Sequence, residues 1–209
     1  MAVVLLDAKS AVHTVLAAVS EEDGQEVRPL PMIELALKNA GIEREAIECV
    51  AVGLGPGSYT GVRSAIALAQ GWQLGRSVGL LGVSSADALA AGAQAKGWFG
   101  RVGVVIDAQR DEFYGAGYEV AEAGWRPKEP LRIASRDEIQ NFASAYDAIV
   151  GPEATKFFPQ ARILCPRADT FGALARGRAD FVPGEKLEPI YLREAKFVKA
   201  PPPRVMPGL

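Results

Sequence analysis

Residues 51–75 read AVGLGPGSYTGVRSAIALAQGWQLG, and this stretch predicts a strand, a tight turn and a helix in that order. A short β-branched run favours the strand, and the closely spaced glycines and proline favour the turn. Ser58 or Thr60 can cap the helix that follows, because a hydroxyl there accepts a bond from a first-turn N–H. The expected helix, residues 60–74, is rich in small residues, so another helix can approach it closely.

The turn has two interpretations, an anion site and a structural or partner-facing turn. Free N–H groups at a helix start favour anions, and Gly55, Gly57 and Ser58 would then make the contact. A Walker loop needs Lys followed by Ser or Thr at this point, whereas Val62 and Arg63 stand here. A dinucleotide fingerprint would sit on the first strand, with an acidic residue about 20 positions on. These failures favour the structural or partner-facing turn.

Composition is that of an ordinary globular chain, with 209 residues, 49% of them apolar and 23% charged. The net charge is −2 and the pI is about 5.6, which argues against a protein that grips nucleic acid by itself. We find neither a signal-peptide pattern nor an apolar run of about 20 residues. A soluble, cytoplasmic protein with no membrane segment is therefore expected.

Few residues are suited to metal binding or nucleophilic catalysis. Cys49 and Cys165 are the only cysteines and stand beside apolar residues, which predicts small buried side chains in a reducing compartment. His13 is the only histidine, so a zinc site or a Ser-His-Asp triad has at most one candidate. We therefore predict neither a metal site nor catalytic residues.

The stretch GLGPGSYTGVRSAIALAQG resembles the signature of the TsaB (YeaZ) family, GPGSFTGxR followed by a small-residue helix, with Tyr59 in place of Phe. Further matches are residues 82–84, GVS; residues 106–114, IDAQRDEFY; and residues 189–193, PIYLR. Relatives also carry a histidine before the helix of residues 31–40, and this chain lacks it.

This resemblance implies a non-catalytic subunit of the machinery that makes N6-threonylcarbamoyladenosine next to the anticodon of tRNAs reading codons that start with A. It implies a TsaD-like catalytic paralogue and a TsaE-like ATPase as partners, and a homodimer when the chain is alone. Transfer RNA would be contacted mainly through the complex. No cofactor is firmly implied, and ATP or ADP would bind only at an interface of the complex.

A strand followed by Asp recurs, with residues 3–6 leading to Asp7 and residues 102–106 to Asp107. The layout resembles the actin-like ATPase superfamily, so the expected fold is α/β, with two ribonuclease-H-like lobes of mixed sheets flanked by helices. We predict lobes at residues 1–100 and 101–193, and a disordered Pro-rich tail at residues 194–209.

The same turns leave an alternative function open, a small ATPase or sugar-type kinase with a degenerate phosphate site. Asp7 or Asp107 would hold Mg²⁺, and the turn with Lys9 would hold phosphate. Both turns lack glycine, however, and carry side chains where the backbone should approach phosphate. We therefore favour Asp7 and Asp107 as turn-forming residues.

Two helices with apolar and small faces, residues 31–40 and 60–74, are the predicted partner interface. An arginine in place of Ala65 or Ala69 is expected to abolish both the homodimer and partner binding. The predicted interface residues are Met32, Ile33, Ala36, Thr60, Val62, Arg63, Ala65, Ile66 and Ala69.

Sequence signals also place helix starts elsewhere in the chain. Ser84 with Asp87, and Ser135 with Glu138, each match a capping box. Asp169 is expected to cap a final helix over residues 169–176.

Overall fold

The computed structural model describes residues 2–6, 15–20 and 29–193, with side-chain contacts from residue 29 onward. The strands are β1 (Ala2–Leu6), β2 (Val15–Ser20), β3 (Cys49–Gly55), β4 (Gly79–Ser84), β5 (Gly100–Asp107), β6 (Glu112–Ala121), β7 (Gly124–Ser135), β8 (Ala148–Gly151) and β9 (Arg162–Ile163). The α-helices are α1 (Pro29–Ala40), α2 (Tyr59–Gly75), α3 (Ser85–Ala95), α4 (Arg136–Ala143) and α5 (Ala168–Ala175). Short 3-10 helices occupy Arg44–Ala46, Ala154–Lys156 and Gly184–Lys186.

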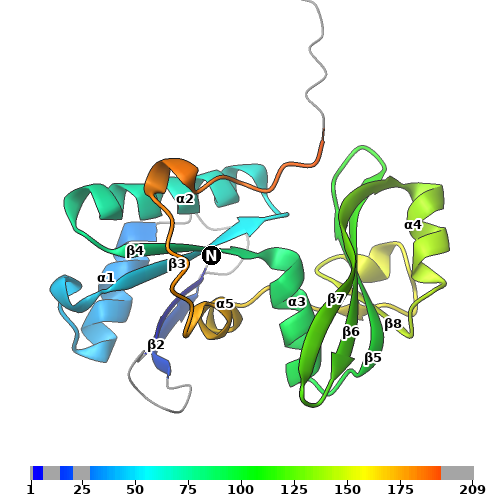
Figure 1. Ribbon diagram of the computed structural model, residues 1–209, viewed down its shortest axis with the longest axis horizontal. Coiled ribbons are helices and arrows are strands. Elements are labelled where there is room, and N and C mark those ends of the chain that lie inside the picture. The colour runs from blue at the N-terminus through cyan, green and yellow to red at the C-terminus, as the bar shows by residue number, and fades with distance from the viewer. Residues whose placement is uncertain (1, 7–14, 21–28, 194–209) are drawn as a thin grey trace, which may run out of the picture.

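The first group of elements contains β1 to β4 with α1, α2 and α5, and lies on the left in Figure 1. β1 and β2 pair antiparallel, and β3 and β4 pair parallel. Helix α2 packs on β3 and β4, so one apolar cluster joins strand residues such as Val52 and Leu80 to Ile66 and Ala69 of the helix. We call these elements the first half.

The second group is a five-stranded mixed sheet in the order β7-β6-β5-β8-β9. β5, β6 and β7 pair antiparallel, whereas β8 runs parallel to β5. Helix α4 covers one face of this sheet, where Phe113, Ile139 and Phe142 are buried together. The predicted α/β class, mixed sheets flanked by helices, is thereby confirmed. We call this sheet with α3 and α4 the second half.

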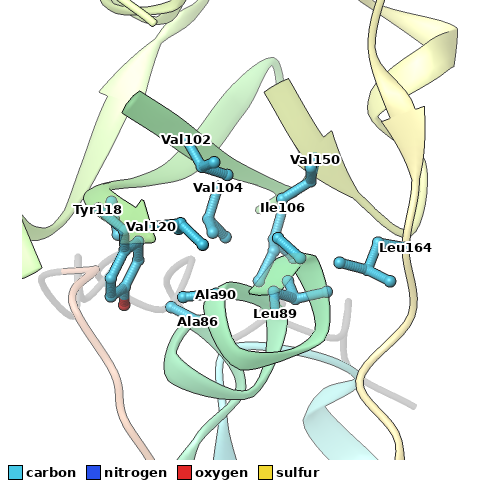
Figure 2. Close-up of a cluster of buried hydrophobic side chains, with 12 residues drawn as sticks. Ala86, Leu89, Ala90, Val102, Val104, Ile106, Tyr118, Val120, Val150 and Leu164 are labelled. Carbon is cyan, nitrogen blue, oxygen red and sulfur yellow. The ribbon is translucent and has the colours of Figure 1, made fainter. Parts of the chain in front are cut away.

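Helix α3 covers the other face of the five-stranded sheet. Figure 2 shows Ala86, Leu89 and Ala90 of this helix directed at Val104 and Ile106 of β5. The helix is almost all small residues, which brings its backbone close to the strands. The main core of the second half therefore includes a helix that precedes the predicted boundary at residue 100, and that boundary stays a prediction.

The chain passes between the halves twice, from β4 into α3 and from β9 into α5. After α5 it stays with the first half, because Val182 N donates to Leu80 O at 3.0 Å and Ile190 N donates to Leu54 O at 2.8 Å. Figure 1 shows this orange segment running past α2 and on toward the hairpin ends of the second sheet. The described residues therefore start in the first half, and the last of them lead from the first half toward the second.

Strand β7 is the longest described strand, and no sequence pattern predicted it. Its residues include Pro127 and Pro130, and prolines argue against a central strand. The strand is tolerated because it forms an edge of the sheet, where an N–H on the open side needs no partner.

Three local predictions are corrected. Asp169 lies inside α5 and does not cap it, since its carboxylate accepts from Arg167 Nη2 at 2.8 Å. Ser84 caps α3 by accepting from Ala86 N, but Asp87 does not complete a capping box, because it accepts a bond from Tyr118. Cys49 and Cys165 are exposed rather than buried, Cys49 because it opens β3.

Several predictions lie outside the described residues, namely those on Asp7, Lys9, His13 and the tail of residues 194–209. Among residues 2–6, 15–20 and 29–193, no helix is both long and apolar enough to span a membrane. The same residues contain no cluster of three or more His, Cys, Asp or Glu suited to a metal ion.

Candidate functional site

The GPGSYTG turn is built around the cap of α2. Ser58 is the N-cap, and its hydroxyl accepts from Gly61 N at 3.3 Å, as one of the two predicted candidates. Thr60 lies within the helix. Gly55 has a φ of +90°, a backbone conformation that glycine adopts without steric cost, and its bond to Pro56 is cis.

The predicted anion contacts are only partly brought together by this turn. Gly57 and Ser58 are exposed, whereas Gly55 is buried. The Ser58 hydroxyl already serves the helix cap, so one of the four unpaired first-turn N–H groups is taken. Because Asp7 and Lys9 lie outside the described residues, the anion site stays a prediction.

A segment near the end of the described chain packs on this turn. The ring of Tyr191 stacks on Tyr59, with centroids 5.6 Å apart and planes inclined by 25°. Arg63 Cζ lies 5.3 Å from the centroid of the Tyr59 ring, and Tyr191, followed by Tyr59, raises the pKa of this guanidinium. Tyr59 and Tyr191 are 63% and 48% exposed, so the three side chains form an aromatic and cationic surface.

Arg193 continues the segment onto the β5–β6 turn of the second half. Its Nε donates to Glu112 Oε2 at 2.9 Å, and its Nη2 donates to Ala108 O at 2.9 Å and to Gln109 O at 3.0 Å. The turn itself is held by Asp107, whose Oδ1 accepts from Gln109 N at 2.7 Å. Asp107 is thus a turn-forming residue, as predicted.

The contacts of Tyr191 and Arg193 unite three motifs that the sequence analysis treated separately: the GPGSYTG turn, the IDAQRDEFY hairpin and the PIYLR segment. No spacing rule could have shown this meeting, since the residues are far apart in the chain. The only signal was that each motif was unusual in composition. We call this meeting point the motif junction.

A groove of about 530 Å³ lies between α1 and α2. Its rim carries two ion pairs, Arg44 with Glu34, and Arg76 with Glu45 at 2.8 Å. Its apolar lining comes from Leu30, Ile33, Leu68, Gly71, Trp72 and Gly75. Leu30 is 60% exposed, and Leu74, at the end of α2, is 91% exposed. The helix pair therefore presents a mostly apolar surface of the kind that proteins use for docking.

The predicted interface residues divide by burial. Met32, Ala36, Ile66 and Ala69 are enclosed in this chain's own interior, so they cannot face a partner in this conformation. Ile33, Val62 and Ala65 are half-buried, and Thr60 and Arg63 are exposed.

The groove residues missed by the sequence analysis follow a helical stripe. Leu68, Gly71, Trp72 and Gly75 recur at intervals of three or four, which places them on one face of α2. Ile66 and Ala69 form the opposite, core-facing stripe. Both stripes are apolar or small, and the sequence offered no signal to tell which one faced the strands.

A buried tyrosine–carboxylate pair lies away from the motif junction and from the groove between α1 and α2. Tyr118 of β6 donates to Asp87 Oδ1 of α3 at 2.8 Å. Burial, and then the charge of Asp87, raise the pKa of Tyr118 well above its usual range. A neutral tyrosine that holds a helix on a sheet serves the fold, and the pair opens onto none of the surfaces described above.

Comparisons with known proteins place the chain among tRNA-modification proteins. Residues 25–171 match the family model described as TsaD, tRNA N6-adenosine threonylcarbamoyltransferase. The chain is 31% identical to the tRNA threonylcarbamoyladenosine biosynthesis protein TsaB of Escherichia coli, over 79% of each protein. It is 37% identical to TsaB of Haemophilus influenzae over 42% of this chain and 37% of that protein.

The fold is similar to solved structures from the same group. A Pseudomonas aeruginosa structure titled YeaZ superposes with a TM-score of 0.70 at 27% identity, covering 91% of this chain and 93% of that one. Another from Pseudomonas aeruginosa, described as uncharacterized with similarity to peptidase YeaZ, gives a TM-score of 0.71 at 28% identity over 92% and 94%.

Proposed function

The chain belongs to the TsaB/YeaZ family of tRNA threonylcarbamoyladenosine biosynthesis proteins, and from that premise we propose that it acts as a non-catalytic docking subunit. It supports threonylcarbamoyl transfer to N6 of the adenosine next to the anticodon of tRNAs reading codons that start with A. It does so by binding a TsaD-like catalytic paralogue, with a TsaE-like ATPase as a further partner. In this role the protein works in the cytoplasm.

The observation that carries this proposal is the apolar groove between α1 and α2. Leu30 lies exposed at its edge, and burial of such exposed apolar area by a partner is favourable. The occupant we propose is the equivalent helix pair of the paralogue. This chain itself matches the TsaD family model, which supports one domain type for both proteins.

We propose that the same surface also forms a homodimer in the absence of the paralogue. A helix pair that fits its counterpart on a related chain also fits a second copy of itself, and such a two-fold contact is self-complementary. We propose that the homodimer and the heterodimer compete for this groove.

The rest of the family's architecture is also proposed for this chain. The first half begins with the antiparallel strand pair β1–β2, and the sheet of the second half begins with the antiparallel pair β5–β6, which supports two related lobes of the actin-like type. The net charge of −2 supports tRNA contact mainly through the complex. We propose that ATP or ADP, if bound at all, binds only at an interface of that complex.

Gly71 offers a sharp test, because a Cβ added there meets no atom within 4 Å. Gly71→Arg should therefore leave the fold intact while its side chain fills the groove. The matched control is Ala123→Arg, an exposed position on the hairpin between β6 and β7. Ala65→Arg is a less clean test, because Ala65 is half-buried against the first-half core, and Ala69 is unsuited because it is fully buried.

The readouts are light scattering of the chain alone and co-purification with its own TsaD-like paralogue. Gly71→Arg should yield a monomer that no longer retains the paralogue, and Ala123→Arg should behave as the parent. If Gly71→Arg keeps both the dimer and the paralogue, the groove is not the docking site. Turnover of Mg-ATP by the purified chain, lost in Asp107→Ala, would instead support the alternative kinase or ATPase function.

A further inference from the structure

Few contacts fix how the two halves lie relative to one another. The apolar cluster of the first half and the two clusters of the second half share no residue. The chain crosses between them at Ser84–Ser85 and again between Leu164 and Ala168. Two neighbouring crossings of this kind act as a hinge unless other contacts oppose rotation. Next to the crossings, α3 also contacts β3, β4 and α5.

The segment of residues 184–191 is bound firmly to the first half. Gly184 N donates to Gln73 Oε1 at 2.7 Å, and Gln70 Nε2 donates to Gly184 O at 2.8 Å, so α2 holds the segment at its start. Leu187 is buried in the first-half core, and Tyr191 stacks on Tyr59. A contact that the chain makes after Tyr191 therefore connects its partner to the first half.

Arg193 makes the next contact, and it is with the second half. Its guanidinium serves three acceptors of the β5–β6 turn: the Glu112 carboxylate and the carbonyls of Ala108 and Gln109. Figure 1 shows the segment reaching the second sheet on the side away from α5. The contact is therefore separated from the second of the two crossings.

The turn is suited to such a contact because of its backbone. Gln109, Arg110 and Asp111 all have φ near +60°, at 63°, 60° and 61°. This conformation is uncommon for residues other than glycine and persists only where surrounding contacts fix it. An arginine can serve several acceptors at once through its planar set of five N–H donors, which a lysine cannot reproduce.

We propose that Arg193 is a positioning residue that locks the two halves in one relative orientation. The first half supplies the anchored segment, the second half supplies the turn, and the guanidinium joins them across the hinge. When the contact is broken, each half keeps its own core, and the angle between the halves becomes variable.

Distance measurements between spin labels on the two halves test this directly. Labels go on Ala67→Cys in α2 and Asn141→Cys in α4, both exposed positions, with the exposed native cysteines replaced by Cys49→Ser and Cys165→Ser. Arg193→Ala should give a distance distribution about twofold broader than the parent, as expected for a released hinge. The thermal unfolding midpoint of Arg193→Ala should match that of the control variant Arg126→Ala, since neither core changes.

The control is Arg126→Ala. Arg126 pairs with Glu119 inside the second sheet, so this variant loses an arginine–glutamate pair without touching the hinge. Its distance distribution should equal that of the parent. The Arg193→Lys variant should also give a broad distance distribution, because an ammonium group cannot bind the carboxylate and both carbonyls at once.

Glu112→Ala provides a second variant in case Arg193→Ala does not fold. It removes the carboxylate and leaves both carbonyl acceptors, so its distribution should be broader than that of the parent. Distributions as narrow as the parent's in the variants that fold would overturn the proposal. So would equal broadening in Arg126→Ala, since the effect would then not be specific to the hinge.

Discussion

The ring of Tyr191 stacks on the ring of Tyr59 at a centroid distance of 5.6 Å, although the two residues lie far apart in the sequence. Tyr59 belongs to the GPGSYTG turn, and Tyr191 to the segment that leads to Arg193. Offset stacking of this kind adds to the free energy of burial. The contact therefore fixes the segment at the point where it leaves the first half.

Tyr191→Ala should lower the free energy of unfolding by about 0.5–1.5 kcal/mol, because the stacked pair and part of the buried ring area are lost. Urea denaturation followed by circular dichroism measures this change. Tyr191→Phe keeps the stack and should remain within about 0.5 kcal/mol of the parent. Equal losses in both variants would show that the hydroxyl, and not the stack, stabilises the segment.

Asp87→Ala should be more destabilising than Tyr118→Phe. Removing the carboxylate leaves the buried Tyr118 hydroxyl without an acceptor, at a cost of about 1–3 kcal/mol, whereas Tyr118→Phe removes the buried donor itself. Urea denaturation at neutral pH measures both. A larger loss in Tyr118→Phe than in Asp87→Ala would contradict this account.

The same pair predicts a loss of stability at alkaline pH. The folded-state pKa of Tyr118 is raised above the unfolded value of about 10, so the unfolded chain releases its proton first. The stabilisation is fully present below about pH 10 and declines as the pH rises toward the folded pKa. The stability difference between the parent and Tyr118→Phe should therefore shrink above about pH 10 in urea titrations. A difference independent of pH would show that Tyr118 ionises normally in the folded protein.

Two glycine substitutions should change the free energy of unfolding in opposite directions. A Cβ at Gly151 would lie 1.9 Å from the carbonyl oxygen of Val105, so Gly151→Ala forces β8 away from β5 and should destabilise by about 3 kcal/mol. Gly71→Ala meets open space within α2 and should stabilise by about 0.5–1 kcal/mol. Thermal and urea unfolding of both variants check the signs. A Gly151→Ala variant as stable as the parent would mean that this backbone approach is not required.

The capping box of α4 should make stability depend on acid. Ser135→Ala removes the cap and should lower the free energy of unfolding by about 1 kcal/mol. Bonds from the backbone N–H and then the hydroxyl of Ser135 lower the folded pKa of Glu138. The contribution of this carboxylate is therefore present above the unfolded pKa of about 4.3 and is lost as the pH falls through the folded pKa.

The measurement is the difference in the free energy of unfolding between the parent and Ser135→Ala, taken at neutral and at acid pH. This difference should become smaller as the pH falls. Ser144→Ala, at the other end of the same helix, is the control and should stay within about 0.5 kcal/mol of the parent. A difference that widens with acid would contradict the assigned shift.

Part of the local chemistry was readable from the sequence alone. Ser58 and Ser135 start their helices as predicted, because a cap depends only on residues within one turn of each other. Asp107 forms its turn for the same reason. The family signature was also readable, since its residues are contiguous.

Only the tertiary structure decided where each stripe of α2, strand β7 and Arg193 pack. The sequence could not tell which stripe of α2 faces the strands, since Ile66 with Ala69 and Leu68 with Gly71 satisfy the same helical period. Nor could it show that β7 is an edge strand that tolerates proline, or that Arg193 reaches the β5–β6 turn. Each of these follows from contacts between residues distant in the chain, and short-range patterns carry no information about them.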